Sequence, residues 1–515
     1  MSAALVRVRP DTYVDSVLLM SASRAMRDVE GVAWGTAVMG TEANLDELRS
    51  RGFGDEDLAS ARANDLVLAV EAASEEAAEE ALEAGMQALS EVGGGEEGEG
   101  PKERRPRSLQ QAVEEAPDFN VALISVPGEH AALEAHKGLS AGLHVLLFSD
   151  NVSLDDEMEL KLRGSELRRF VMGPGAGTAM LGGVGLGFAN VVQRGPIGVV
   201  AAAGTGAQEV SSLLDRWGVG VRNLVGVGGR DLSERVEGRM TRMALDVFEE
   251  DDEVEAVLLV SKPPSPEVAA DLLKRLGEGK PAAAALIGLA EELDAPEGVR
   301  LARTLEEGVR LTMETLGREA PDTSEGLEER VREAIQDLDD DRTAVRGLFA
   351  GGTLCYEAMV VLSERLGDEV LSNTPLRDGW GLPAPEGAHV CLDLGEEEYT
   401  RGRPHPMLDP EPRADLIAEA ADDPWVGAIL VDVVLGHGAH EDPASLLAPA
   451  CAAAVSKGAL VVAYVLGTEG DPQGLGDQQR KMEQAGCLLA PTGARSALMA
   501  AAVASRDPAM AGGSP

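Results

Sequence analysis

Short apolar runs of the kind that form buried parallel strands recur along most of this chain. Asn120–Val126, Leu143–Phe148 and Ile197–Ala202 are each followed by glycine or small polar residues, with helical stretches between them. Val254–Val260 and Val426–Val433 continue the series. Strands that are buried on both faces are continuously apolar, and their alternation with helices is typical of a doubly wound sheet, which binds ligands at the carboxyl ends of its strands. The sequence therefore predicts an α/β fold with mainly parallel sheets.

A chain of 515 residues is too long for one hydrophobic core, and its pattern divides it into several parts. Residues 1–90 alternate between strand and helix patterns, which predicts a small ferredoxin-like α/β domain. A linker rich in glycine and charge follows at 91–107. We expect the other parts to be α/β regions at 108–193 and 194–289, an acidic helical connector at 290–342, and a further α/β unit at 343–515.

The charge of the chain excludes two classes of partner. It carries 45 basic and 89 acidic residues, for a formal net charge of −44. A surface this negative repels nucleic acid and anionic lipid, so neither is expected to bind. A well-solvated acidic surface and adaptation to salt both explain such an excess of carboxylates. In either case an anionic substrate needs a local positive field, made by backbone N–H groups, helix N-termini and a few arginines.

The sequence also predicts a cytoplasmic protein. No apolar run reaches about 18 uninterrupted residues, so we expect no membrane span, and residues 1–10 lack the apolar core of a signal peptide. The cysteines (Cys355, Cys391, Cys451 and Cys487) form no CxxC pair, which favours reduced thiols and argues against a zinc site. Cys355 is the one thiol that merits a test as a nucleophile.

Two glycine-rich turns, each between an apolar run and a helical stretch, carry a related pattern. Residues 203–209 are AGTGAQE and residues 350–357 are AGGTLCYE, and each has a glutamate four residues after its threonine. Backbone N–H groups in such a turn can approach an anion, and the helix dipole adds about half a positive charge. The threonine could donate to a phosphate or carboxylate, or it could cap its helix. The duplication predicts two related units in one chain, with paired helix ends that bind an anion.

Two histidines follow another predicted strand. His437 and His440 lie in a glycine-rich segment, where they could act as a proton donor or as partners of an oxyanion. Asp432 could orient His437 or cap a helix. We predict these three residues as catalytic. The two histidines lack a third metal ligand, so no metal site is expected.

Several cationic and polar residues could complete an anion site. Arg401, Arg403 and His405 form a cationic cluster that could capture a carboxylate or phosphate, or could form surface ion pairs. Arg230, after two glycines, is open to the same two interpretations. The predicted anion- or substrate-binding residues are Gly204, Thr205, Gly206, Gln208, Arg230, Gly351, Gly352, Thr353, Asn373, Thr374, Arg401, His405 and Gly436.

Longer motifs resemble the α-subunit of succinyl-CoA synthetase and, more closely, the FdrA family. Resemblance to the α-subunit rests on Gly173–Gly175, Gly187–Asn190, Arg194–Val199 and the first Gly-Thr turn. The FdrA motifs are Ser149–Val152, Gly228–Ser233, Ser261–Pro264, Gly351–Glu357, Ser372–Leu376, Thr400–Met407 and Asp432–His440. They occur in order over nearly the whole chain. The resemblance implies a CoA-binding-like domain at 108–193 and ligase-like units at 194–289 and 343–515.

The chain departs from succinyl-CoA synthetase where that enzyme carries phosphate. The enzyme uses a histidine in a Gly-His-Ala segment, but the matching Lys280–Leu289 contains no histidine. The glutamate that orients this histidine is replaced by the proline-rich Ser261–Pro264. No ATP-grasp domain, Walker-type loop or glycine-rich nucleotide turn is recognisable. These departures argue against an ATP-driven phosphohistidine mechanism.

The FdrA resemblance implies a subunit of oxamate carbamoyltransferase, which converts oxalurate and phosphate to oxamate and carbamoyl phosphate in anaerobic allantoin breakdown. That reaction needs no cofactor, and it depends on holding two anionic groups in line. An NDP-forming acyl-CoA synthetase subunit, with its ATP-binding subunit on a separate chain, is one alternative. A non-catalytic assembly subunit that binds an acyl metabolite is another. The expected partners are a small anionic substrate, phosphate, companion subunits of a hetero-oligomer and further copies of this chain.

Overall fold

The computed structural model describes residues 3–12, 14, 16–54, 58–93, 106, 108–289, 293–400 and 404–514. Most of the predicted linker and the segment 401–403, with the predicted site residue Arg401, lie outside these ranges. The chain divides into two compact units, one of residues 1–105 with 397–404 and the other of residues 106–396 with 405–515. Within the described ranges, no helix is long and apolar enough to cross a membrane.

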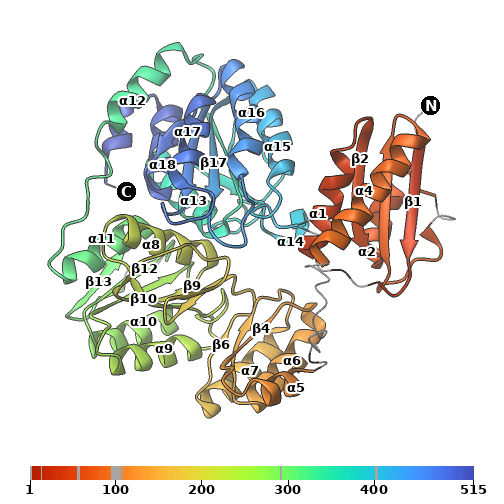
Figure 1. The fold of residues 1–515 in the computed structure, drawn as a ribbon. Helices are drawn as coiled ribbons and strands as arrows, with labels where there is room; N and C mark the ends of the chain where they lie inside the picture. The colour runs from red at the N-terminus through yellow and green to blue at the C-terminus, as the bar shows by residue number, and fades with distance from the viewer. Residues whose placement is uncertain are drawn as a thin grey trace. The chain divides into compact units, whose positions relative to one another are not determined.

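The first unit is the small α/β domain predicted for the N-terminus. Its three strands form an antiparallel sheet in the order β1-β3-β2 (Figure 1). Central β3 alternates, so that Leu66, Leu68 and Val70 pack with α1 and α4, and Val67 and Ala69 pack against the α2 side. The elements are β1 (Ala3–Arg9), α1 (Ser16–Arg27), β2 (Val32–Met39), α2 (Glu42–Ser50), β3 (Leu66–Ala72), α4 (Glu75–Gly93) and the short α14 (Glu397–Thr400).

The second unit begins with a small parallel sheet in the order β4-β5-β6. Its apolar residues belong to the same hydrophobic core as one face of the next sheet, so the two sheets pack as one body. The elements are α5 (Leu109–Glu115), β4 (Val121–Ile124), α6 (Gly128–Ser140), β5 (His144–Leu147), α7 (Leu154–Leu167) and β6 (Val171–Met172).

The next sheet has seven strands in the order β13-β12-β11-β9-β10-β7-β8, parallel except for the β7–β8 hairpin at one edge. Strand β13 lies in the segment predicted as a helical connector. It is four residues long and forms by pairing with β12, which no local pattern reveals. The elements are β7 (Thr178–Leu181), β8 (Val184–Gly187), β9 (Arg194–Ala202), α8 (Gly204–Arg216), β10 (Val221–Gly226), α9 (Arg239–Glu250), β11 (Ala256–Ser261), α10 (Pro266–Gly277), β12 (Ala282–Leu286), β13 (Val299–Ala302), α11 (Leu305–Thr315), α12 (Leu327–Ala334) and the 3₁₀ turn η1 (Ile335–Asp337).

The last sheet has six parallel strands in the order β15-β16-β14-β17-β18-β19. Helices α15, α16 and α17 lie on one side of it and α13 and α18 on the other (Figure 1). The elements are β14 (Ala344–Phe349), α13 (Gly352–Leu366), β15 (Val370–Ser372), β16 (His389–Asp393), α15 (Glu411–Asp422), β17 (Val426–Val434), α16 (Pro443–Ser456), β18 (Leu460–Leu466), α17 (Leu475–Gln484), β19 (Leu488–Ala490), α18 (Gly493–Ser505) and η2 (Pro508–Gly512).

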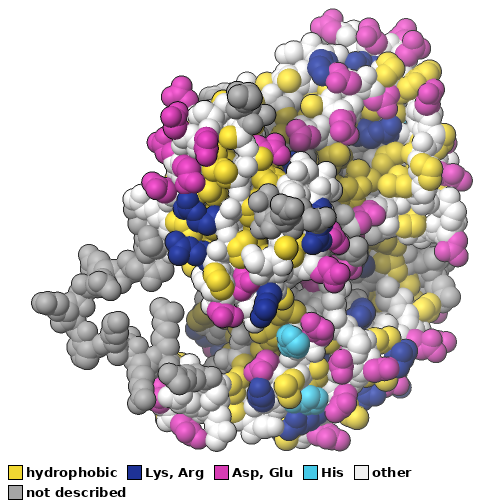
Figure 2. All heavy atoms as spheres, turned by 90° about the vertical axis from the view of Figure 1, so that its right-hand side faces the viewer, with side chains coloured by type: hydrophobic (Ala, Val, Ile, Leu, Met, Phe, Trp, Pro, Cys, Tyr) yellow, Lys and Arg dark blue, Asp and Glu magenta, His cyan; other side chains and the backbone are white. Residues whose placement is uncertain are grey.

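One hydrophobic core joins the seven-stranded and six-stranded sheets. Helices α8 and α11 cover the first sheet, α13 and α18 cover the second, and the apolar residues of all four belong to a single cluster. The prediction of two related, mainly parallel α/β units is confirmed. On the visible surface, acidic side chains are spread widely with basic ones between them, without forming one large patch (Figure 2).

Candidate functional site

The two Gly-Thr turns start two helices that lack a cap of their own. Helix α8 begins at Gly204 after β9, and α13 begins at Gly352 after β14. Their N-cap residues, Ala203 and Gly351, make no side-chain hydrogen bond to the helix. Helices α7, α11 and α18 each begin after a serine or threonine whose hydroxyl accepts a backbone N–H, while α6, α9 and α10 also begin without such a cap. The first N–H groups of α8 and α13 are therefore left for other partners.

The two helix ends touch each other. The Thr353 N–H donates to Thr205 Oγ1 across 3.1 Å. A Cβ added to Gly206 would lie 3.0 Å from Thr353 Cγ2, and one added to Gly351 would lie 2.7 Å from Thr205 Cγ2. Thr205 thus caps the opposite helix, whereas the Thr353 hydroxyl makes no hydrogen bond to any described residue. The helix ends that the duplication predicts as partners are adjacent.

A pocket of about 320 Å³ opens beside these helix ends. Its wall includes both threonines, Gly204, Gly352 and Gln208. Gln208 is 1% exposed, and within the described part of the chain its Nε2 has no hydrogen-bond partner. A buried amide without a partner loses the hydrogen bonds that it would make in water. A ligand in the pocket could supply the missing acceptor for Gln208 Nε2.

Lys262, which the sequence reasoning did not select, adds a positive charge to the pocket wall. It directly follows β11 and is half-buried. It makes no hydrogen bond or ion pair with a described side chain, and it lowers the pKa of Asp393. A lysine directly after a buried strand was the available signal, because parallel strands end at the ligand-binding edge of their sheet.

Acidic groups form another part of the wall. Asp393, the last residue of β16, is 3% exposed, and burial raises its pKa to about 6 although Lys262 opposes the shift. Asp150 also lines the pocket, and its pKa is raised by burial and by Glu396. The sequence did not predict Asp150, Asp393 or Glu396 as site residues.

Asn373 and Thr374 support the pocket and do not line it. The Asn373 side chain donates to the Asp393 carbonyl at 2.9 Å and accepts the Asp393 N–H at 3.0 Å. The Thr374 N–H donates to Ser372 Oγ at 3.0 Å. Asn373 therefore fixes the end of β16 and with it the Asp393 carboxylate.

His405 lines the pocket, while Arg401 and Arg403, the other members of the predicted cationic cluster, lie outside the described residues. Burial lowers its pKa to about 4, so the imidazole is neutral near pH 7. Its Nδ1 accepts the Met407 N–H at 3.2 Å. The neutral ring therefore carries its proton on Nε2.

The predicted catalytic histidines lie outside this pocket. His437 is exposed, and its backbone pairs with Ala189, with N···O distances of 2.8 and 3.3 Å. His440 Nδ1 accepts the Asp442 N–H at 3.0 Å. Gly436, at φ 114°, donates its N–H to Gln473 Oε1. These contacts join the loop after β17 to its neighbours.

Asp432 holds the turn before α13 and makes no hydrogen bond to His437. Its two carboxylate oxygens accept the N–H groups of Ala350 and Gly351, each at 2.8 Å. Arg413 Nη2 donates to the same carboxylate at 2.7 Å, and both side chains are almost fully buried. The buried ion pair fixes the position of the turn.

Arg230 is engaged in a network beside the pocket. Its Nε donates to Glu157 Oε2 at 2.7 Å and its Nη2 to the Val152 carbonyl at 2.8 Å. Lys161, fully buried, donates to Glu157 and Asp231 at 2.8 and 2.9 Å. The network anchors the loop whose Gly228 and Gly229 line the pocket.

The glutamates that follow the two threonines lie away from the pocket. Glu209 accepts the N–H of Gly493, the first residue of α18, and the Tyr464 hydroxyl. Glu357 accepts the N–H of Leu305, the first residue of α11, while its Oε2 has no partner among the described residues. Burial raises their pKa values to about 7 for Glu209 and about 8 for Glu357. Both are structural groups at the packing of the two sheets.

Cys355, the thiol singled out for a test, is fully buried. Burial and nearby acidic groups raise its pKa well above the usual range. A thiol held in its protonated form is a poor nucleophile.

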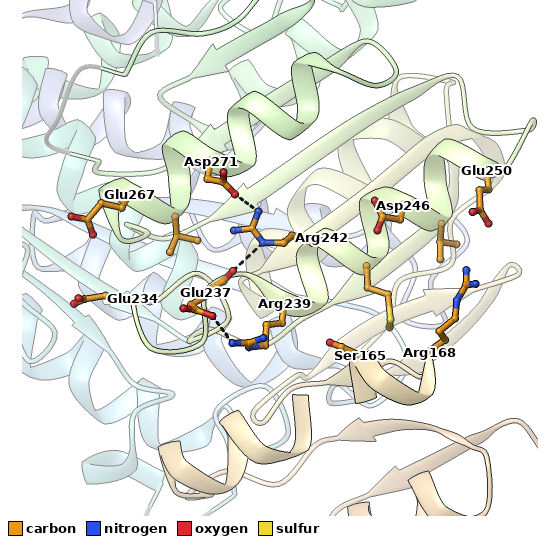
Figure 3. Close-up of a pocket in the computed structure, with 13 residues that line it drawn as sticks. Ser165, Arg168, Glu234, Glu237, Arg239, Arg242, Asp246, Glu250, Glu267 and Asp271 are labelled. Carbon is orange, nitrogen blue, oxygen red and sulfur yellow. Dashed lines mark hydrogen bonds and ion pairs between the residues drawn. The ribbon is translucent and has the colours of Figure 1, made fainter. Parts of the chain in front are cut away.

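A larger surface groove of about 790 Å³ lies over α9 and α10 (Figure 3). Arg242 bonds to Asp271 and to the Glu237 carbonyl, and Arg239 bonds to the Glu237 carboxylate. The groove is lined by six acidic and three basic side chains, and two of these arginines are already engaged with Asp271 and Glu237.

The comparisons with known proteins agree with this fold. Residues 348–503 match a family model described as CoA-ligase. Residues 1–106 match the model "AllF, heavy metal-associated domain". The uncharacterized protein YahF of Escherichia coli K12 is 37% identical over 97% of this chain and 98% of its own length. Subunit alpha 1 of the ADP-forming succinate–CoA ligase of Archaeoglobus fulgidus is 30% identical over 41% of this chain and 72% of its own.

The chain belongs to the succinyl-CoA synthetase-like family. A solved structure, the apo dinucleotide forming acetyl-coenzyme A synthetase 1 of Ca. Korarchaeum cryptofilum, covers 78% of this chain and 86% of its own, with 15% identity and a TM-score of 0.29.

The heavy-metal description of the N-terminal model does not fit the residues of this member of the family. Residues 1–106 contain neither cysteine nor histidine, the thiolate and imidazole ligands that soft metals prefer. Across the described part of the chain, no group of three or more His, Cys, Asp or Glu side chains could hold a metal ion.

Proposed function

We propose that the pocket between α8 and α13 binds the phosphate of an acyl phosphate, and that this chain is the acyl-phosphate-handling subunit of a hetero-oligomeric enzyme. One observation carries the proposal: two helix N-termini whose own N-cap residues make no side-chain hydrogen bond meet at a pocket. That pocket also holds Lys262 and the Gln208 amide, which has no partner among the described residues. Helix N-termini and backbone N–H groups favour phosphate. In a chain of net charge −44, these donors attract an anion locally, in a pocket that Asp150, Asp393 and Glu396 also line.

An acyl phosphate takes part in both candidate reactions, acyl-CoA formation and the phosphorolysis of a ureido acid. In an acyl-CoA ligase, a CoA thiol attacks the acyl carbon and phosphate leaves, forming a thioester. The relatives named as ADP-forming succinate–CoA ligase subunits support this class. Those names also support companion subunits for this chain.

The second reaction is the phosphorolysis of a ureido acid such as oxalurate. A phosphate oxygen attacks the carbamoyl carbon, the bond from that carbon to the oxamate nitrogen breaks, and the nitrogen takes up a proton. The products are oxamate and carbamoyl phosphate. The absence of histidine from Lys280–Leu289 favours this reaction, because it needs no phosphate carrier on the protein.

His405 does not replace the missing carrier. A histidine that accepts phosphate on Nε2 attacks with the lone pair of that nitrogen. Because the Met407 N–H occupies Nδ1, the neutral His405 ring holds its proton on Nε2 and is a hydrogen-bond donor there.

The test is calorimetry and thermal shift on the full chain with phosphate, acetyl phosphate, carbamoyl phosphate, CoA and ATP. We expect phosphate and both acyl phosphates to raise the melting temperature, because a ligand of the folded state stabilises it by mass action. The variant Gly352→Ala should lose this response, since its Cβ would overlap Asp393 Oδ2. Arg239→Ala, in the surface groove, is the control and should respond as wild type does.

Stabilisation by CoA or ATP without any response to phosphate would contradict the acyl-phosphate site. To separate the two reactions, the chain is assayed with its companion subunits. Thioester formation from an acyl phosphate and CoA supports the ligase, and carbamoyl phosphate formed from oxalurate supports the transferase. If the chain is a transferase subunit, incubation with labelled ATP should leave no acid-labile phosphate on it.

A further inference from the structure

Asp393 and His405 flank Gly395 on the pocket wall. A Cβ added to Gly395 would stand 2.7 Å from His405 Nε2 and 3.2 Å from Asp393 Oδ1. The two atoms are therefore separated by no more than the sum of these distances, about 6 Å. A residue without a side chain keeps the space between them open toward the pocket.

The two side chains offer opposite hydrogen-bonding groups. His405 Nε2 carries a proton because Nδ1 accepts the Met407 N–H, and Nε2 has no partner in the described ranges. Asp393 Oδ1 accepts the Gly395 N–H at 3.0 Å, while Oδ2 makes no hydrogen bond to a described residue. A carboxylate can accept about four hydrogen bonds, so acceptor capacity remains. A donor and an acceptor thus lie within about 6 Å of each other.

Neighbouring residues fix the position of Asp393 and favour its ionised form. Asn373 clamps the backbone of Asp393 on both its N–H and its carbonyl. Lys262 favours the ionised form of Asp393, against the opposing effects of burial, Glu396 and Asp432. Phe188 packs beside His405, with ring centroids 6.0 Å apart. Fixed groups of this kind discriminate between ligands because a ligand that lacks the matching group leaves them unpaired.

We propose that Asp393 and His405 together select acyl phosphates whose acyl carbon bears an N–H group. His405 Nε2–H donates to the acyl carbonyl oxygen, and the Asp393 carboxylate accepts from the adjacent N–H. The carbonyl oxygen and the N–H of an amide sit side by side on one carbon, so one amide can bond to a donor and an acceptor that lie within about 6 Å of each other. A methyl group at that place leaves Asp393 unpaired, and a carboxylate there is repelled. The inference rests on the proposed acyl-phosphate site and adds its selectivity.

Carbamoyl phosphate and acetyl phosphate provide the test, because they have the same shape and differ in NH₂ against CH₃. Their dissociation constants are measured by calorimetry on the full chain, with inorganic phosphate as reference. We expect wild type to prefer carbamoyl phosphate by about ten- to a hundredfold, the ratio for one hydrogen bond to a charged group. In Asp393→Ala the ratio should fall to near one. Removing a negative charge changes affinity for both ligands alike, so the ratio cancels that effect.

Two further variants keep the test decisive. His405→Gln retains an N–H donor and should keep most of the preference. Asp271→Ala removes a carboxylate of the surface groove and should leave the ratio at its wild-type value. If Asp393→Ala does not fold, Asp393→Asn is used, and its neutral amide should still reduce the ratio.

Equal wild-type affinities for the two acyl phosphates, or an unchanged ratio in the Asp393 variant, would overturn the inference while leaving the acyl-phosphate site intact. If folded wild type binds neither phosphate nor either acyl phosphate, the proposed function itself is wrong. The two failures are therefore distinguishable.

Discussion

Thr205 and Thr353 occupy equivalent positions in the two glycine-rich turns, yet their hydroxyl groups have different partners. Thr205 Oγ1 accepts the N–H of Thr353, whereas the Thr353 hydroxyl bonds to no described residue. Both residues are buried: Thr205 is 5% exposed and Thr353 is 3% exposed. The sequence predicts both as donors to the anion, and only the structure shows that one also caps the opposite helix.

This difference predicts that valine substitutions, which remove the hydroxyl at nearly constant volume, act differently at the two positions. Thr205→Val leaves the Thr353 N–H unpaired, so it should cost about 1–3 kcal/mol of stability as well as binding. Thr353→Val should keep the melting temperature and weaken phosphate binding about ten- to a hundredfold. Denaturant unfolding and phosphate calorimetry on both variants check this. Equal loss of stability in the two variants would contradict the asymmetry.

At the scale of elements, the turn before α13 depends on a strand that lies beside it. Asp432, near the end of β17, binds two N–H groups of that turn and pairs with Arg413 of α15. Asp432 thus connects β17, α15 and the turn before α13, and this turn forms part of the pocket wall.

We predict that Asp432→Ala lowers stability by about 3–5 kcal/mol, because it leaves the buried Arg413 without its counter-charge. The free energy of unfolding from denaturant titration measures this cost. His437→Ala changes an exposed residue of the loop that follows β17, and it is the comparison that should leave that free energy almost unchanged. If Asp432 instead served to orient His437, the Ala variant would lose activity at unchanged stability.

Local sequence patterns predicted those strands and turns that are determined by their own residues. Buried runs such as Ile197–Ala202 and the turns at Gly204 and Gly352 show in the sequence because period and glycine placement are local properties. Strand β13 does not, because it exists through pairing with β12. Asp393 ends β16 and Lys262 follows β11, two strands of different sheets, and no spacing in the sequence predicts that these residues line one pocket. His405 looked cationic beside two arginines, and only its burial shows that it is neutral.

For the whole molecule, the packing of the two sheets buries carboxyl groups that titrate near neutral pH. Burial raises the pKa of Glu209 from 4.5 to about 7 and that of Glu357 from 4.5 to about 8. Between the unfolded and folded values, the folded state binds more protons than the unfolded state. Stability therefore decreases as pH rises from about 4.5 to about 8, by about 1.4 kcal/mol per pH unit for each such proton.

We predict that Glu357→Gln is more stable than wild type at pH 8 and has a flatter dependence of stability on pH. Glutamine cannot ionise, and its carbonyl can still accept the Leu305 N–H. Melting temperatures from pH 5 to 9 measure both effects. Glu419→Gln, which removes the same charge from an exposed position, should keep the wild-type slope. Parallel curves for wild type and Glu357→Gln would show that this carboxyl does not titrate in that range.

The two helices that meet at the pocket, α8 and α13, belong to one polypeptide. Their encounter is intramolecular, so its effective concentration is set by the fold and not by the amount of protein in solution. A site assembled from two separate chains would lose its ligand upon dilution as the chains dissociate. Here the phosphate affinity should be the same at nanomolar and micromolar protein. It also follows that the two halves of the site are always produced in equal amounts.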